Sequence, residues 1–259
     1  MLLKTLRTGI HFDSDHLNVI GLHWADAHYQ KTRHSLSSDR RDKGQQNIMK
    51  VCEIFTSIQG ESTYAGVPCT FIRMSGCNLR CTYCDTTYAY DEGRELSEEE
   101  ILDEVRKAGF RTIEITGGEP LLQGGIFPLM KRLLDQGYRL LIETNGSQEI
   151  SGIDDRAIVI LDIKTPGSGM SEAMRLSNLS CLKPGDEVKF VLTGREDYEW
   201  SKDVITAYSL LARYEILFSP AFDMVDPAHL ARWILDDRLE VRLNLQLHKY
   251  LYGPHCRGV

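Results

Sequence analysis

Three cysteines lie close together in one short segment of the chain. Cys77, Cys81 and Cys84 follow a C-x3-C-x2-C spacing, and the other four of the seven cysteines are scattered. Thiolates are soft ligands that suit iron–sulfur clusters, zinc or copper(I). A closed zinc site usually takes four ligands as two separated pairs, and Cys181 and Cys256 supply no second pair. The spacing therefore favours a four-iron cluster with one iron open to substrate, and the alternative is a zinc site completed by a distant Cys or His.

The composition is ordinary for a soluble globular protein. Of 259 residues, 42% are hydrophobic and 26% are charged. The formal net charge of −7 argues against a bare nucleic-acid binder, which would show a basic stripe. No apolar run reaches the roughly 18 residues of a membrane span, and the N-terminus has no signal-peptide core. We therefore expect a cytoplasmic protein without nucleic-acid or membrane partners.

The first 48 residues differ in composition from the rest. They hold five of the eight histidines and contain no glutamate, proline or cysteine. The polar run 35–43 is typical of a solvated linker. We expect residues 1–48 to be an N-terminal extension that is disordered or not native to the enzyme. Residues 49–259 are then one domain that begins at Met49.

Strand-like and helix-like segments alternate after Met49. Ser97 and Glu100 form a capping box at the start of a helix that Gly109 ends. A further helix is capped by Asp226, and others are expected at 127–136 and about 196–212. The expected strands cover 69–74, 112–116, 138–143, 157–162, 187–193, 215–219 and 241–247.

This alternation predicts an α/β fold. Six or seven strands separated by helices or long loops form a mainly parallel sheet, either open or curled into a partial barrel. The chain has fewer helices than a full eight-unit barrel requires. In such folds the functional groups gather at the carboxyl ends of the strands, so the loops there are the candidate site.

Polar loops follow several of these strands. Residues 116–120 are Thr-Gly-Gly-Glu-Pro, 143–146 are Glu-Thr-Asn-Gly, and 162–169 bring a lysine and hydroxyls to the same edge. Paired glycines let a backbone approach a ligand closely, and the Glu119 carboxylate can receive an ammonium group. Each of these loops, taken alone, is also a plausible turn.

The cysteine spacing directly after a strand, with the Gly-Gly-Glu loop one strand later, resembles the radical S-adenosylmethionine superfamily. The resemblance implies a partial (β/α)6-type TIM barrel with some helices reduced or missing. It also implies a [4Fe–4S] cluster on Cys77, Cys81 and Cys84, whose open iron binds S-adenosylmethionine and generates a 5′-deoxyadenosyl radical. The implied contacts to S-adenosylmethionine are Tyr83, Asp85, Gly118, Thr144 and Asn145.

Residues outside the cysteine and Gly-Gly-Glu loops indicate which family within this superfamily the chain resembles. The segment 58–61, Cys84-Asp85-Thr86 and the C-terminal segment 245–250 together resemble the 7-carboxy-7-deazaguanine synthase family, over about 49–254. This resemblance implies conversion of 6-carboxy-5,6,7,8-tetrahydropterin into 7-carboxy-7-deazaguanine by radical ring contraction with loss of ammonia, in queuosine biosynthesis. It also implies a homodimer and an electron donor such as flavodoxin or ferredoxin.

The same resemblance assigns substrate and metal contacts. Thr86 is the implied ligand of Mg²⁺, a hard cation that takes oxygen ligands. The Gln59 amide can satisfy donor and acceptor edges of a pterin, and Arg73 can offset a carboxylate. The implied substrate contacts are Ile58, Gln59, Gly60, Arg73 and Thr116.

Three basic residues are further candidates for the site. They are Lys189, His248 and Lys249, although a strand lysine is usually solvated and a C-terminal His-Lys pair is more often structural.

Two other protein classes compete with this interpretation. The first competing class is a radical activase of a glycyl radical enzyme, which would share the cysteine and Gly-Gly-Glu loops. The second is a non-enzymatic iron–sulfur or zinc binding protein.

Overall fold

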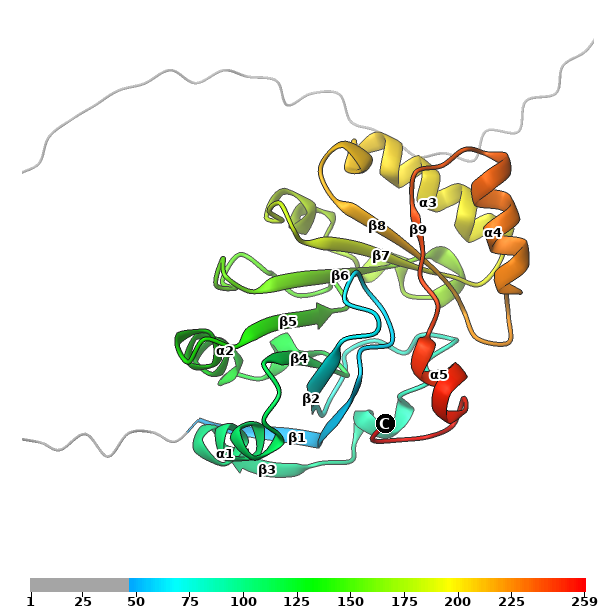
Figure 1. Cartoon of the computed structure of the whole chain (residues 1–259). Helices are drawn as coiled ribbons and strands as arrows, with labels where there is room; N and C mark the ends of the chain where they lie inside the picture. The colour runs from blue at the N-terminus through cyan, green and yellow to red at the C-terminus, as the bar shows by residue number, and fades with distance from the viewer. Residues whose placement is uncertain (1–46) are drawn as a thin grey trace, which may run out of the picture. The chain divides into compact units, whose positions relative to one another are not determined.

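The computed structural model describes residues 47–259, and one nine-stranded sheet organises them (Figure 1). The strands lie in the order β3-β1-β2-β4-β5-β6-β7-β8-β9. The expected N-terminal extension lies outside the described residues except for its last two, and its boundary at residue 48 stays a prediction. The strands are β1 (Ile48–Ile58), β2 (Pro68–Met74), β3 (Arg94–Ser97), β4 (Thr112–Gly117), β5 (Arg139–Thr144), β6 (Ile158–Lys164), β7 (Glu187–Leu192), β8 (Glu215–Pro220) and β9 (Arg242–Leu243).

The strands from β2 through β4 to β9 pair in parallel, whereas β1 pairs antiparallel with both β2 and β3. Within the described residues, no α-helix connects β5 to β6, and only short 3-10 turns connect β6 to β7. The expected partial barrel with reduced or missing helices is confirmed. The helices are α1 (Glu98–Ala108), α2 (Ile126–Asp135), α3 (Arg195–Ala207), α4 (Pro227–Asp236) and α5 (Leu247–Tyr252).

The two faces of the sheet have different chemistry, because side chains alternate along each strand. On β4, Ile113 and Ile115 are fully buried in the main hydrophobic core, together with apolar residues of α1 to α4. The opposite, concave face carries Glu114 and Thr116, which line a cavity. A small apolar cluster of Leu141, Ile160 and Leu217 lies on that concave face, where Tyr64 of the β1–β2 loop packs against it.

The predicted caps of α1 and α4 are confirmed. Ser97 accepts a hydrogen bond from the Glu100 backbone N–H, and the Glu100 side chain bonds back to the Ser97 backbone. Gly109 ends α1 in the left-handed region, with φ at 77°. Asp226 accepts from the backbone N–H of Ala228 at the start of α4. Local sequence therefore determines these helix boundaries.

Two of the sequence predictions were wrong in detail. In the segment predicted as a strand over 241–247, only Arg242 and Leu243 pair with β8, because the next side chain binds the β1–β2 loop. Asn244 accepts from the backbone N–H of Ser62 at 2.9 Å, and α5 begins three residues later. The helix predicted over about 196–212 ends at Ala207, and a 3-10 turn follows.

Candidate active site

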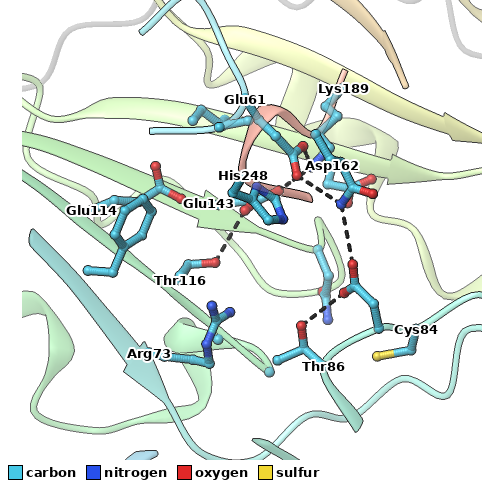
Figure 2. A pocket seen from close by; sticks show the side chains of 18 of the residues that line it. Glu61, Arg73, Cys84, Thr86, Glu114, Thr116, Glu143, Asp162, Lys189 and His248 are labelled. Carbon is cyan, nitrogen blue, oxygen red and sulfur yellow. Dashed lines mark hydrogen bonds and ion pairs between the residues drawn. The ribbon is translucent and has the colours of Figure 1, made fainter. Parts of the chain in front are cut away.

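A single cavity lies at the carboxyl ends of the parallel strands, over the concave face (Figure 2). Except for Glu119, every residue that the sequence assigned to the cluster, S-adenosylmethionine, the substrate or Mg²⁺ lines this cavity, although the chain positions span from 58 to 145. Parallel strands bring the loops at the carboxyl ends of β2, β4 and β5 to one edge, whereas Ile58, Gln59 and Gly60 reach the cavity through the β1–β2 loop, since β1 is antiparallel to β2. The roles of the individual residues stay predictions. The residues are Ile58, Gln59, Gly60, Arg73, Cys77, Cys81, Tyr83, Cys84, Asp85, Thr86, Thr116, Gly118, Thr144 and Asn145.

The cysteine loop leaves β2 and presents three half-buried thiols to the cavity. Cys77 Sγ accepts hydrogen bonds from the backbone N–H of Leu79 at 3.4 Å and from Asn145 Nδ2 at 3.7 Å. Such donors stabilise a thiolate that ligates iron. Burial raises the pKa of Cys81 to about 11, a cost that metal ligation would offset because a bound thiolate is deprotonated. The loop fits a cluster with three cysteine ligands.

The geometry fits a cluster better than a single ion. Among residues 47–259, no three His, Cys, Asp or Glu side chains converge closely enough to hold one metal ion. One zinc ion would hold two thiolates about 3.8 Å apart, because each Zn–S bond is about 2.3 Å. Iron–sulfur clusters are held by cysteine thiolates, and the three thiols of this loop all line the cavity.

The Gly-Gly-Glu loop packs directly on the cysteine loop. Gly117 has φ at 135°, and a Cβ there would overlap the backbone of Met74. A Cβ on Gly118 would overlap the carbonyl of Gly76. The backbone N–H of Glu119 donates to that same carbonyl at 2.8 Å. The two glycines are therefore required for the loops to meet, and both line the cavity.

Glu119 does not face the cavity. Its fully buried carboxylate accepts from the backbone N–H groups of Leu121 at 3.0 Å and Asn145 at 2.7 Å, and from Thr144 Oγ1 at 2.8 Å. Three protein donors therefore occupy this carboxylate, and its role as the acceptor of a ligand ammonium group stays a prediction. Instead, Glu119 joins the Gly-Gly-Glu loop to the loop after β5.

Lys189 lies between two carboxylates on the concave face (Figure 2). Its Nζ is 2.5 Å from Glu61 Oε2 and 2.7 Å from Glu143 Oε1. Burial would lower the pKa of Lys189, but the Glu143 and Glu61 charges raise it well above its usual range. Burial would raise the pKa of Glu61, but Lys189 holds it below its usual range. Lys189 therefore lines the cavity as a candidate site residue and is not the solvated strand lysine of the alternative interpretation, and it holds the β1–β2 loop against β5.

The C-terminal helix α5 is tied to the cysteine loop. Lys249 Nζ lies 2.6 Å from Asp85 Oδ2, and Gln246 Nε2 donates to the same oxygen at 3.3 Å. Thr86 Oγ1 donates to Asp85 Oδ1 at 2.9 Å. Burial opposes ionisation of Asp85, but Lys249 holds its pKa well below its usual range. His248 and Lys249 both line the cavity, so the C-terminal segment is part of its wall.

Comparison with known proteins gives the family. The family description Radical SAM superfamily matches residues 71–162. A 7-carboxy-7-deazaguanine synthase from Koribacter versatilis (strain Ellin345) is 43% identical over 226 residues, which cover 82% of this chain and 100% of that relative. One from Chlorobaculum tepidum is 44% identical over 214 residues, covering 82% and 97%. The chain belongs to the 7-carboxy-7-deazaguanine synthase family.

A solved structure shares the fold of this synthase-family chain. The crystal structure of QueE from Escherichia coli aligns with a TM-score of 0.65 at 24% sequence identity. The alignment covers 78% of this chain and 95% of the Escherichia coli protein.

Among residues 47–259, no helix is long and apolar enough to cross a membrane.

Arg73 of this synthase-family chain faces the cavity with part of its guanidinium free. Nε bonds to Glu53 at 2.8 Å, while Phe55 and Tyr88 flank the guanidinium at 5.5 and 6.0 Å from their ring centres. The Tyr88 hydroxyl also donates to Glu53 at 2.9 Å, which fixes that carboxylate. Nη1 and Nη2 have no hydrogen-bond partner among the described residues, so they are available to an anionic ligand.

Two fully buried polar atoms in the cavity wall lack hydrogen-bond partners in the described part of the chain. They are the Tyr83 hydroxyl and Asp162 Oδ1, both buried. The other Asp162 oxygen pairs with Lys164 at 2.6 Å. Unsatisfied buried polar atoms are costly, and a bound ligand would satisfy them. Both therefore fit a polar cofactor beside the cysteine loop.

Sequence reasoning missed Glu114 and undervalued Glu143 and Lys189. The available signal was the period-two pattern, because residues 112–116 read Thr-Ile-Glu-Ile-Thr and Glu187-Val188-Lys189 repeats that alternation. Polar residues at every second position of a strand in a parallel sheet mark the face that lines a site. Buried parallel strands are otherwise almost continuously hydrophobic.

Proposed function

We propose that this chain is a radical S-adenosylmethionine carbon–nitrogen lyase that converts 6-carboxy-5,6,7,8-tetrahydropterin into 7-carboxy-7-deazaguanine. The reaction contracts the ring and releases ammonia, in queuosine and related 7-deazapurine biosynthesis. The observation that carries the proposal is the shared cavity. It joins the cysteine loop to the Ile58–Gly60 segment and to Arg73, in a chain of this synthase family.

Cys77, Cys81 and Cys84 would hold a [4Fe–4S] cluster, which when bound supplies the reductive cleavage of S-adenosylmethionine and hence a hydrogen-abstracting carbon radical. Gly118 lets its loop pack against the cysteine loop, because a side chain would overlap the Gly76 carbonyl, and it lines the cavity where the cofactor would bind. Asn145 donates toward Cys77 and so couples the cofactor wall to the cluster loop.

The remaining cofactor contacts follow from polar groups around the same loop. Tyr83 and Asp162 offer the unpartnered donor and acceptor atoms described above. Thr144 is held by Glu119, and Asp85 is held by Lys249, so both have fixed positions before the cofactor binds. Preorganised polar groups of this kind orient a ligand without further ordering cost.

On the substrate side, Arg73 binds the carboxylate through its free Nη atoms, since a guanidinium forms paired bonds with a carboxylate. Thr116 Oγ1 donates to Glu143 at 3.2 Å and leaves its lone pairs for the substrate. Gln59 has less capacity than expected. Its Nε2 donates to Glu114 and its Oε1 accepts from the Glu61 backbone at 3.1 Å, so each end keeps only one further bond for a ligand.

Mg²⁺ is part of the proposal, with Thr86 as its ligand. Thr86 starts a 3-10 turn, but its side chain makes no capping hydrogen bond to that turn. The hydroxyl instead donates to Asp85 and lies on the cavity wall. Oxygen ligands of this kind suit Mg²⁺, which also keeps water and substrate ligands.

Four further parts of the proposal rest on membership in the family. We infer a homodimer, electrons supplied by flavodoxin or ferredoxin, and a cytoplasmic location. We also infer an enzyme domain at 49–259, with residues 1–48 outside the catalytic machinery. The start of β1 at Ile48 supports a division close to this position.

Anaerobic turnover tests the function. Reconstituted protein is incubated with carboxytetrahydropterin, S-adenosylmethionine, Mg²⁺ and dithionite, and the products are identified by mass spectrometry. We expect 7-carboxy-7-deazaguanine and ammonia in equal amounts. Deoxyadenosine formation without the deazaguanine would favour an activase of a glycyl radical enzyme. Protein that holds zinc instead of iron and does not cleave S-adenosylmethionine would be a binding protein.

A further inference from the structure

Glu114 is a buried carboxyl group that the mechanism above does not use. It lies in the middle of β4, is 4% exposed, and lines the cavity (Figure 2). Its Oε2 accepts a hydrogen bond from Gln59 Nε2. Its Oε1 has no partner among the described residues. A buried polar group without a full set of bonds is costly, so this atom invites a ligand.

The surroundings of Glu114 fit a flat heterocycle. In the strand register it lies between Phe71 of β2 and Leu141 of β5. The Phe71 ring stacks on Phe55 at 5.0 Å between centroids, with 10° between the ring planes. All these side chains except Leu141 line the cavity. An aromatic surface beside a hydrogen-bonding group is the usual composition of a site for a ring with polar edges.

The distance along the sheet between Glu114 and Arg73 suits the two polar ends of a bicyclic pterin. In the pairing of β2 with β4, Arg73 is opposite Thr116, so Glu114 lies two residues back along the strand. Two residues of a strand span roughly 6.6 Å. A bicyclic pterin that carries a carboxylate on one ring and an amino group on the other is a rigid molecule with separate polar ends. When Arg73 binds the carboxylate, the hydrogen-bonding groups of the other ring lie near Glu114.

We propose that Glu114 is a specificity-determining residue that hydrogen-bonds the amino-pyrimidinone end of the substrate while Arg73 binds its carboxylate. This inference rests on the proposed function and deepens it. Gln59 holds Glu114 in place, so the side chain needs no ordering when the substrate binds. A site built to bond an amino group rejects analogues without it, because its own polar atoms are left unpaired.

The protonation state of the Glu114 carboxyl group determines which hydrogen bonds it can form with a ligand. Burial, reinforced by the Glu143 and Glu61 carboxylates, raises the pKa of Glu114 well above its usual range, although the Lys189 charge and the Gln59 hydrogen bond oppose this shift. A neutral carboxyl group presents one O–H donor beside one carbonyl acceptor. An N–H next to a ring nitrogen or carbonyl oxygen, as in an amino-pyrimidinone, complements that pair. A glutamine side chain offers the same combination of one donor and one acceptor.

Equilibrium binding tests the inference without turnover. Reconstituted protein with S-adenosylmethionine but no reductant is titrated with 6-carboxypterin and with 6-carboxylumazine, which has an oxygen in place of the amino group. We expect the wild type to prefer the pterin about tenfold or more. Glu114→Leu removes this preference by weakening pterin binding, whereas Glu114→Gln retains most of it. If Glu114→Leu does not fold, Glu114→Asp, which withdraws the carboxyl group by one methylene, replaces it and is expected to lose the preference.

Glu187→Gln is the matched control. Glu187 is a buried carboxylate of β7 that bonds Thr63 and does not line the cavity. Its substitution leaves the pterin preference unchanged. An unchanged preference in both Glu114→Leu and Glu114→Asp overturns the inference, even if wild-type turnover proceeds. Failure of the wild type to form 7-carboxy-7-deazaguanine instead overturns the proposed function.

Discussion

Gly118 lies against the carbonyl of Gly76, with no room for a β-carbon between them. The contact joins the Gly-Gly-Glu loop to the loop that carries Cys77. Hydrogen bonds from the backbone N–H groups of Gly118 to Met74 at 3.1 Å and of Glu119 to Gly76 at 2.8 Å complete it. The position of the cysteine loop therefore depends on a glycine more than 40 residues away in the chain.

Substitution of this glycine tests that dependence. In Gly118→Ala the β-carbon displaces the cysteine loop, and we expect the iron content after reconstitution to fall severalfold. Iron and sulfide assays and the visible absorption spectrum measure it. Gly124→Ala is the control, because a β-carbon at Gly124 meets no atom within 4 Å. Wild-type iron content in Gly118→Ala would show that the loop tolerates displacement.

Removal of the buried lysine tests the charge cluster on the concave face. Lys189→Met leaves the half-buried Glu61 and Glu143 carboxylates without their shared buried cation. Breaking a buried ion pair by removing one partner costs about 3–5 kcal/mol, so we expect a comparable loss in the free energy of unfolding. Chemical denaturation measures it. Lys131→Met, which removes the exposed pair with Asp135 on α2, is expected to change little.

The pH dependence of stability tests the environment of His248. Burial is the main cause that lowers the pKa of His248 below 6.5, despite the nearby Glu61 and Asp85 charges. The folded state then binds fewer protons than the unfolded state, so stability falls as the pH drops through the unfolded pKa. In His248→Gln this contribution is absent. The difference in the free energy of unfolding between the wild type and His248→Gln should change by at most about 1.4 kcal/mol per pH unit.

Thermal unfolding of both proteins between about pH 5 and 7 measures the effect. Acidic groups also destabilise the fold at low pH, and the comparison with His248→Gln removes their shared contribution. Parallel curves for wild type and variant would mean that His248 titrates normally in the folded protein.

The proposed magnesium ligand is tested at Thr86. Thr86→Val removes the hydroxyl at nearly constant volume, so the Mg²⁺ concentration for half-maximal turnover should rise about tenfold, the effect of losing roughly 1.4 kcal/mol of binding. Iron content and S-adenosylmethionine cleavage without substrate should stay unchanged. An unaltered Mg²⁺ response would remove Thr86 from the metal site.

Substitution of single cysteines separates cluster ligands from the remaining thiols. Cys77→Ser, Cys81→Ser and Cys84→Ser should each abolish cleavage of S-adenosylmethionine, because serine does not replace a soft thiolate ligand. Cys181→Ser is the control, since Cys181 is exposed and does not line the cavity. Cleavage activity that survives in any one of the three variants would exclude that cysteine as a ligand.

The sequence alone determined the fold class, the capped helix ends and most of the residues around the cavity. Strand and cap signals act over a few residues, and the cysteine spacing is contained in one loop, so local patterns were sufficient. Residues such as Gly118 and Asn145 follow the ends of strands, and the parallel sheet brings these ends together.

Only the tertiary structure decided how the charged side chains pair. Lys189 binds Glu61 and Glu143 because the β1–β2 loop folds across the concave face, and that path depends on Asn244 far along the chain. Glu119 turns away from the cavity because Thr144 and Asn145 occupy its carboxylate. These partners come from separate strands and loops, and their meeting depends on strand register and loop packing, which no local sequence pattern contains.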